Sequence, residues 1–162
     1  MTYYKAPPGA PTSRFTFSHD ENFKGIGGVH YANSETCEGY EQLGTPGAPA
    51  TSIALETGKV HSFGVGASLY IVIGLPLAAS KFYNCNSYIT FPTEPGFDYD
   101  YRVTKKGDTC GFLLRRSAQS SDGHPQWEDA PFNLRELVPY KGCKPATEGA
   151  TAGLKVAPVR DQ

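Results

Sequence analysis

Apolar and polar residues alternate along several short segments of this chain, and Gly- and Pro-rich stretches separate the segments. Residues 14–18 (RFTFS) are the first such segment, and their period of two predicts a strand. Residues 25–33 (GIGGVHYAN) predict a second strand, with Val29 and Tyr31 on one face. The glycines at its start are typical of a β-bulge or a sharp bend.

The middle of the chain continues this pattern. Residues 41–52 (EQLGTPGAPATS) are rich in turn formers and predict a connection. Residues 52–55 and 59–63 flank Gly58 and predict a hairpin, because glycine readily takes the positive φ of a tight turn. Residues 69–73 (LYIVI) show no polar alternation, which predicts a central strand covered on both faces.

The stretch from residue 84 to residue 116 predicts a three-stranded meander. Its strands are residues 87–91, 99–104 and 110–116, with turns at residues 92–98 and at KKGD. Period two places three aromatic residues on one face of the middle strand and charged residues on the other: Phe97, Tyr99 and Tyr101 against Asp98, Asp100 and Arg102. We expect the aromatic face in the core, since the opposite face is polar. The alternative is an exposed tyrosine platform for a glycan or a partner protein.

The two ends of the chain lack strand periodicity. Residues 1–13 predict a flexible lead and residues 144–162 a loose tail, which leaves a single domain over residues 14–143. Within it, residues 129–137 predict at most one short helix, capped by Asp129. Many short strands between turns favour an all-β antiparallel β-sandwich, with a small β-barrel as the alternative.

Composition narrows the class of protein. The 162 residues include 18 Gly and 13 Pro, a density that disfavours long helices. The net charge is −1 and basic residues form no long run, so we expect no nucleic-acid partner. The longest apolar run, residues 69–79, contains Gly74 and Pro76 and is shorter than the about 20 residues of a membrane span. The polar start contains no signal peptide, and we interpret it as the beginning of a mature chain.

Motifs for catalysis are weak. Ser68 in GVGAS lacks the second glycine of a nucleophile elbow and precedes an apolar strand, so we interpret this segment as a glycine bend. No phosphate-binding glycine loop occurs. Asp98 and Asp100 share one strand face but lack a third ligand, so we predict no metal site and no cofactor. The remaining enzymatic hypothesis is a hydrolase with an unfamiliar site that uses His61 or His124.

The four cysteines, Cys37, Cys85, Cys110 and Cys143, form no CxxC pair and lack histidines at zinc-finger spacing. Their even number and wide spacing in a loop-rich chain favour two disulfides. Disulfides persist in oxidising compartments, so we expect a periplasmic, outer-membrane-anchored or secreted protein.

The pattern C-x5-F-P-x3-G-x2-Y, carried by Cys85, Phe91, Pro92, Gly96 and Tyr99 and followed by Cys110, resembles one found in small bacterial cell-envelope lipoproteins of unassigned function. The likeness covers about residues 51–116. It implies a precursor with an N-terminal lipid anchor and a Cys85–Cys110 bond, which leaves Cys37–Cys143. A regular meander, however, would separate Cys85 and Cys110 by about 10 Å, more than a disulfide allows, so the spacing leaves the pairing open.

Together these features predict a non-enzymatic cell-envelope or secreted domain with a structural or binding role. Its expected partner is an envelope protein or a glycan. A secreted inhibitor or effector that presents a loop is a further alternative, with residues 44–52 (GTPGAPATS) or 117–126 (SAQSSDGHPQ) as the loop.

Overall fold

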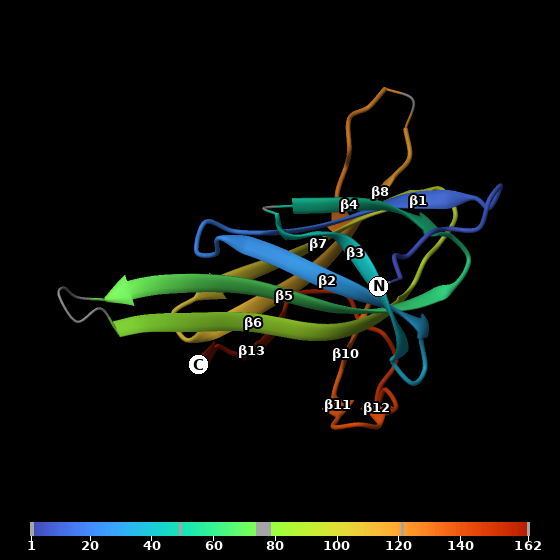
Figure 1. Ribbon diagram of the computed structural model, residues 1–162. Helices are drawn as coiled ribbons and strands as arrows, with labels where there is room; N and C mark the ends of the chain where they lie inside the picture. The colour runs from blue at the N-terminus through green and yellow to red at the C-terminus, as the bar shows by residue number, and fades with distance from the viewer. Residues whose placement is uncertain (1, 49, 74–78, 121, 162) are drawn as a thin grey trace.

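The protein is a β-sandwich of two six-stranded sheets packed face to face (Figure 1). The computed structural model describes residues 2–48, 50–73, 79–120 and 122–161. Within these ranges it contains no helix, and the sheets do not close into a barrel. The predicted all-β sandwich is confirmed. No helix that could span a membrane occurs in the described part of the chain.

The first sheet, sheet I, has the strand order β13-β8-β7-β1-β4, with β9 beside β8. All neighbours are antiparallel except β1 and β7, which run parallel. Its strands are β1 (Thr12–His19), β4 (Ala50–Glu56), β7 (Phe97–Lys106), β8 (Thr109–Ala118), β9 (Glu128–Asp129) and β13 (Lys155–Pro158).

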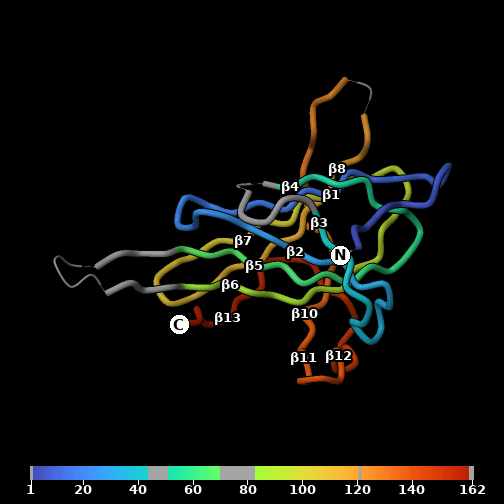
Figure 2. Tube along the Cα trace, viewed as in Figure 1, coloured from blue at the N-terminus to red at the C-terminus, as the bar shows by residue number. Residues whose placement is uncertain are grey.

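The second sheet, sheet II, is antiparallel and has the order β10-β6-β5-β2-β3, with β14 also beside β6. Its strands are β2 (Gly25–Asn33), β3 (Glu38–Ala48), β5 (Val60–Ile73), β6 (Ala79–Pro92), β10 (Asn133–Arg135) and β14 (Arg160–Asp161). A separate pair, β11 (Leu137–Val138) and β12 (Gly142–Cys143), forms a small arm that projects from the sandwich (Figure 2).

Aromatic side chains fill the space between the sheets. Phe15 of sheet I stacks on Phe63 of sheet II with ring centroids 4.7 Å apart, and Phe91 lies 5.3 Å from Tyr99. Tyr101 is fully buried and its hydroxyl is 2.7 Å from that of Ser87 in the opposite sheet. The alternation predicted for β1 and β7 thus has its aromatic face in the core, and the exposed-platform alternative is wrong for Tyr99 and Tyr101.

Two predicted strand pairings are wrong because the chain changes sheets at their turns. Strands β4 and β5 flank Gly58 as expected, but β4 pairs with β1 and β5 pairs with β2 and β6. The predicted meander breaks in the same way, since β6 belongs to sheet II while β7 and β8 form a hairpin in sheet I. Turn residues mark where a strand ends, but they do not determine which sheet the next strand joins.

The change of sheet also explains the Cys85–Cys110 disulfide, which joins β6 to β8 across the core with its Cα atoms 5.6 Å apart. The expected distance of about 10 Å assumed that the two strands belong to one sheet, whereas β6 and β8 belong to different sheets that face each other. The second disulfide is Cys37–Cys143. Both bonds are the pairs that the lipoprotein resemblance implied. Two disulfides indicate an oxidising, extracytoplasmic environment.

Residues 69–73 are not a central strand. Pairing of β5 with β2 ends at Ser68, and beyond it the described backbone of β5 pairs with β6 alone. The described part of the apolar run therefore belongs to a stretch where only β5 and β6 pair (Figure 1). Residues 74–78 of this run lie outside the described residues.

The expected helix at residues 129–137 is absent, and the same residues contribute to β9, β10 and β11. Asn133–Arg135 instead completes the edge of sheet II beside β6, where its backbone gains sheet hydrogen bonds. The predicted loose tail at residues 144–162 likewise contains β13 and β14, which pair with β8 and β6.

The beginning of the chain is also attached to the sandwich. Strand β1 starts at Thr12, inside the predicted flexible lead, and the backbone of Tyr4 donates to Gln42 of β3. The described part of residues 41–52, expected as a connection, extends β3 and β4.

Candidate functional site

An open cleft of about 740 Å³ lies between β3, β6, β10 and the arm formed by residues 136–143, and it extends past β14 to Phe112 and Ala157 of sheet I. We call it the tyrosine cleft. The residues that characterise it are Glu38, Tyr40, Asn86, Tyr88, Tyr140 and Arg160. Its volume falls within the roughly 300–1,000 Å³ that is usual for ligand sites.

Two glycines of β5 shape the sheet surface beside the cleft. A Cβ atom at Gly64 would lie 3.0 Å from the hydroxyl of Tyr31 and 3.2 Å from the ring of Tyr88. At Gly66 it would lie 2.6 Å from the side-chain oxygen of Asn86. The missing side chains let these neighbouring groups lie flat across the sheet.

A small second core supports the arm. Tyr31, Cys37 and Cys143 are buried together, with Val29, Tyr88 and Leu137 packed against them. Burial raises the pKa of the Tyr31 hydroxyl, so it stays neutral. The shared face predicted for Val29 and Tyr31 is confirmed, and it is the outer face of sheet II.

The Cys37–Cys143 disulfide fastens the arm to the turn between β2 and β3. Beside it, the backbone N–H of Cys143 donates to the carbonyl of Thr36 over 2.8 Å. The preceding residue must be glycine, because Gly142 has φ +78° and a Cβ there would collide with the same Thr36 carbonyl. The arm and the turn are therefore in direct backbone contact.

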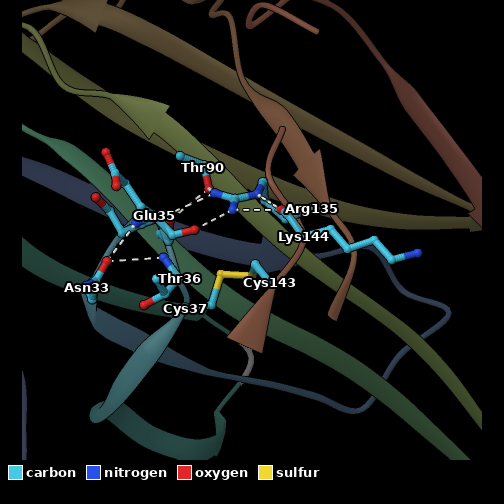
Figure 3. The surroundings of a disulfide bond; sticks show 10 residues. Asn33, Glu35, Thr36, Cys37, Thr90, Arg135, Cys143 and Lys144 are labelled. Atoms are coloured by element: carbon cyan, nitrogen blue, oxygen red, sulfur yellow. Dashed lines mark hydrogen bonds between the residues drawn. A yellow bond between two sulfur atoms is a disulfide. The ribbon is translucent and has the colours of Figure 1, made fainter. Parts of the chain in front are cut away.

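Arg135 forms a second anchor, which Figure 3 shows beside the disulfide. All five N–H donors of its guanidinium are used. They reach the carbonyls of Ser34, Glu35 and Lys144 and the hydroxyl of Thr90, over distances of 2.6–3.2 Å. Burial lowers the pKa of Arg135, and the charge of Glu35 opposes this shift. One side chain thus ties the arm to the β2–β3 turn and to β6.

Two tyrosines of the cleft point into solvent. Tyr40 is 72% exposed and Tyr140 is fully exposed. Tyr140 also has φ +62°, which is uncommon for a residue with a side chain. It follows Pro139 in a turn closed by a 2.9 Å hydrogen bond from Lys141 N–H to the Val138 carbonyl, at a position where glycine is usual.

The histidine of the hydrolase hypothesis, His61, lies away from this cleft in a closed chain of hydrogen bonds. Its Nε2 donates to the carbonyl of Glu56 over 2.7 Å, and its Nδ1 is 2.9 Å from Nε2 of His30. His30 contacts Glu41 over 3.1 Å, and the ring of Tyr4 covers it. Burial lowers the pKa of His61 to about 4. Burial also lowers the pKa of His30, although the neighbouring Glu41 carboxylate acts to raise it. Both rings are buried, and each ring nitrogen faces a protein group. When both rings are neutral, His30 donates from Nε2 to Nδ1 of His61, and Nδ1 of His30 then carries no proton to donate to Glu41.

The other predicted catalytic and metal candidates, His124, Asp98 and Asp100, line a second cleft of about 410 Å³ on sheet I. No hydrogen bond joins the His124 ring to either carboxylate in the described part of the chain. His124 is exposed in the loop between β8 and β9, where its backbone N–H donates to Asp122. Asp98 accepts hydrogen bonds from Arg14 N–H and Gln119, while Asp100 pairs with Arg115. Among the described residues no group of three or more His, Cys, Asp or Glu could hold a metal ion. Ser68 lies within β5 between Gly25 and Asn84 rather than at a bend.

Sequence reasoning did not single out Tyr40 or Tyr140. One signal for Tyr140 was present, since a Pro-Tyr pair between short apolar segments places a bulky residue where a turn favours glycine. No comparable signal existed for Tyr40, because the cleft joins segments almost one hundred residues apart. Comparisons with protein families, with characterised proteins and with solved structures found no match.

Proposed function

We propose that this chain is a non-catalytic binding domain of a cell-envelope or secreted protein, and that the tyrosine cleft is its binding site. The proposed partner is an envelope protein or a glycan. As in the cell-envelope lipoproteins that the sequence resembles, a lipid anchor on the precursor would hold the domain at the membrane surface.

Tyr140 carries this proposal. Left-handed backbone costs a non-glycine residue about 1–2 kcal/mol, and the fully exposed ring recovers none of it by burial within the chain. Strained, exposed residues of this kind are concentrated at functional sites. Tyrosine in particular is enriched where proteins bind ligands, because its ring offers apolar area and a polar tip.

The anchoring of the arm supports the same proposal. A disulfide, a five-donor arginine and a direct backbone contact hold a segment whose tip has no packing role. Fixing the position of Tyr140 before a ligand arrives reduces the conformational entropy lost on binding.

The histidines favour a binding domain over a hydrolase. His30 and His61 are buried, and their ring nitrogens face protein groups, so neither ring is presented to a substrate. His124 is exposed, and although Ser117 and Ser120 line the same cleft, its ring forms no hydrogen bond to a serine, threonine or cysteine in the described part of the chain.

The loop between β8 and β9 supports a second candidate, an inhibitor or effector that presents a loop. Residues 117 and 118 end β8, and the described part of residues 119–126 projects from the sandwich (Figure 1). Binding that is lost on changing this loop, and not on changing Tyr140, would favour this candidate.

The test compares wild type with Tyr140→Gly, a change that relieves the backbone and removes the ring. The matched control is Tyr3→Ala, because Tyr3 is an exposed tyrosine that does not line the cleft. The probes are a panel of purified envelope proteins and a panel of oligosaccharides, with affinity measured by calorimetry. We expect at least one probe to bind wild type and Tyr3→Ala equally and Tyr140→Gly at least about tenfold more weakly, a loss of about 1.4 kcal/mol. Binding that is unchanged in Tyr140→Gly, or absent for both panels, would refute the proposal.

A further inference from the structure

The tyrosine cleft presents aromatic faces from three separate parts of the fold. Tyr40 comes from β3, Tyr88 from β6 and Tyr140 from the turn of the arm. A flat ring needs only two side-chain torsions to be fixed on binding, so it contributes contact area at low entropic cost. Such rings pack well against ligands that have flat apolar faces, and the C–H faces of pyranose sugars are of this kind.

The polar groups of the cleft are unsatisfied by the protein itself. Among the described residues, the hydroxyls of the three tyrosines and the amide of the exposed Asn86 form no hydrogen bond. Hydroxyls and amides both donate and accept. A sugar hydroxyl also does both, so the lining of the cleft matches a polyhydroxylated ligand.

The charges of the cleft favour a neutral ligand. Glu136 is 2.9 Å from Lys144, and the guanidinium of Arg135 is fully occupied by its carbonyl and hydroxyl partners. Glu38 and Arg160 remain, with opposite charges and with no side-chain partner in the described part of the chain. An anionic or cationic polymer would find no excess of opposite charge here.

A peptide added as an extra strand fits less well. The edge of sheet II next to the cleft is β3, and the start of the chain already pairs with it. The N–H of Tyr4 donates to the Gln42 carbonyl over 3.1 Å, and the N–H of Gln42 donates to the Thr2 carbonyl over 2.7 Å. These bonds occupy the backbone N–H and C=O of Gln42, so an added strand could not pair with the edge of β3 past this residue.

We infer that the tyrosine cleft binds a neutral oligosaccharide, whose sugar rings stack on Tyr40 and Tyr140 and whose hydroxyls bond to Asn86, Glu38 and Arg160. This inference rests on the proposed function, since it names the ligand of the same site. The volume of about 740 Å³ and the open shape suit several linked sugar units.

The experiment uses cellotetraose, chitotetraose and maltotetraose as neutral probes and tetragalacturonate as the anionic probe. Calorimetry measures affinity, and NMR of tyrosine rings reports which side chains contact the sugar. The variants are Tyr40→Ala, Tyr140→Gly and Asn86→Ala, with Tyr3→Ala as the control. We expect at least one neutral tetrasaccharide to bind saturably, to shift the ring signals of Tyr40 and Tyr140, and to bind each cleft variant about tenfold more weakly or worse.

Three results would overturn the inference. They are no saturable binding of any neutral probe, equal binding by the cleft variants and the control, and preferential binding of tetragalacturonate. If the envelope proteins tested above bind through Tyr140 while the sugars do not, the oligosaccharide inference fails and the proposed function stands. If neither panel binds, both fail.

Discussion

The Cys85–Cys110 disulfide lies between the two sheets, where both residues are almost completely buried, whereas Cys37–Cys143 lies outside the sandwich beneath the arm. The inner bond connects strands that the core already holds together. The outer bond connects the β2–β3 turn to a segment 106 residues away, which packs only on a small second core. The inner disulfide therefore supports the fold, and the outer one supports the cleft.

Loop length adds to this contrast. A disulfide stabilises mainly by restricting the unfolded chain, and the effect grows with the number of residues enclosed. The outer bond encloses the longer loop, although it lies farther from the core. Four measurements test the comparison, in order of decreasing expected effect.

Replacing Cys37 and Cys143 with alanine should give the largest loss. A loop of this length corresponds to about 4–5 kcal/mol in the free energy of unfolding, measurable by urea denaturation. The arm should also open locally, so hydrogen exchange of β11 and β12 should accelerate and ligand affinity at the cleft should fall. Unchanged affinity would show that Arg135 and Gly142 position the arm without the disulfide.

Replacing Cys85 and Cys110 with alanine is the matched change in the core. The two cysteines are 25 residues apart, and a disulfide that closes a loop of this length corresponds to about 3–4 kcal/mol in the free energy of unfolding. Hydrogen exchange of the arm and affinity at the cleft should stay as in wild type. A loss greater than that of the outer pair would show that packing around the buried sulfurs outweighs loop length.

Acidification should weaken the sandwich without a separate effect on the arm. The folded pKa of His61 lies at about 4, below its unfolded value of about 6.5, so folding favours the neutral ring. The contribution of His61 to the free energy of unfolding is therefore fully present above pH 6.5, and about 3 kcal/mol of it is lost as the pH drops to 4. The lowered pKa of His30 adds in the same direction. Urea denaturation across this range should show the fall in wild type and in both disulfide variants, and His61→Gln should flatten it. An equally steep fall in His61→Gln would contradict this assignment.

Arg135→Met should have the smallest effect on stability. It removes the donors to the Glu35 and Lys144 carbonyls, while the Ser34 carbonyl and the Thr90 hydroxyl keep their hydrogen bonds to Ser62. The exposed surroundings also let water replace part of the loss, so we expect about 2 kcal/mol in urea denaturation. Arg135→Lys should recover only part of this, because an ammonium group cannot reproduce the fork of the guanidinium. The control is Arg160→Met, which should stay within about 0.5 kcal/mol of wild type because the Arg160 side chain is exposed. A full recovery by lysine would show that charge alone matters.

Period-two patterns predicted the strands and their faces well. The aromatic face of β7, the alternation of β1 and the shared face of Val29 and Tyr31 all follow from side chains alternating across a strand. The helix at residues 129–137 was wrong because the sequence showed only a cap and a rough apolar face. Pairing with the edge of sheet II decided the conformation of those residues.

The amino-acid sequence by itself determined the all-β class, the positions of most turns and, through an even number of cysteines, the oxidising compartment. These properties depend on local conformational preferences and composition, which act within a few residues of the chain. Tertiary structure decided the sheet to which each strand belongs, the path of both disulfides and the tyrosine cleft. Each of these depends on contacts between distant segments, such as Tyr40 with the arm or Cys85 with Cys110, and no local pattern records which distant segments meet.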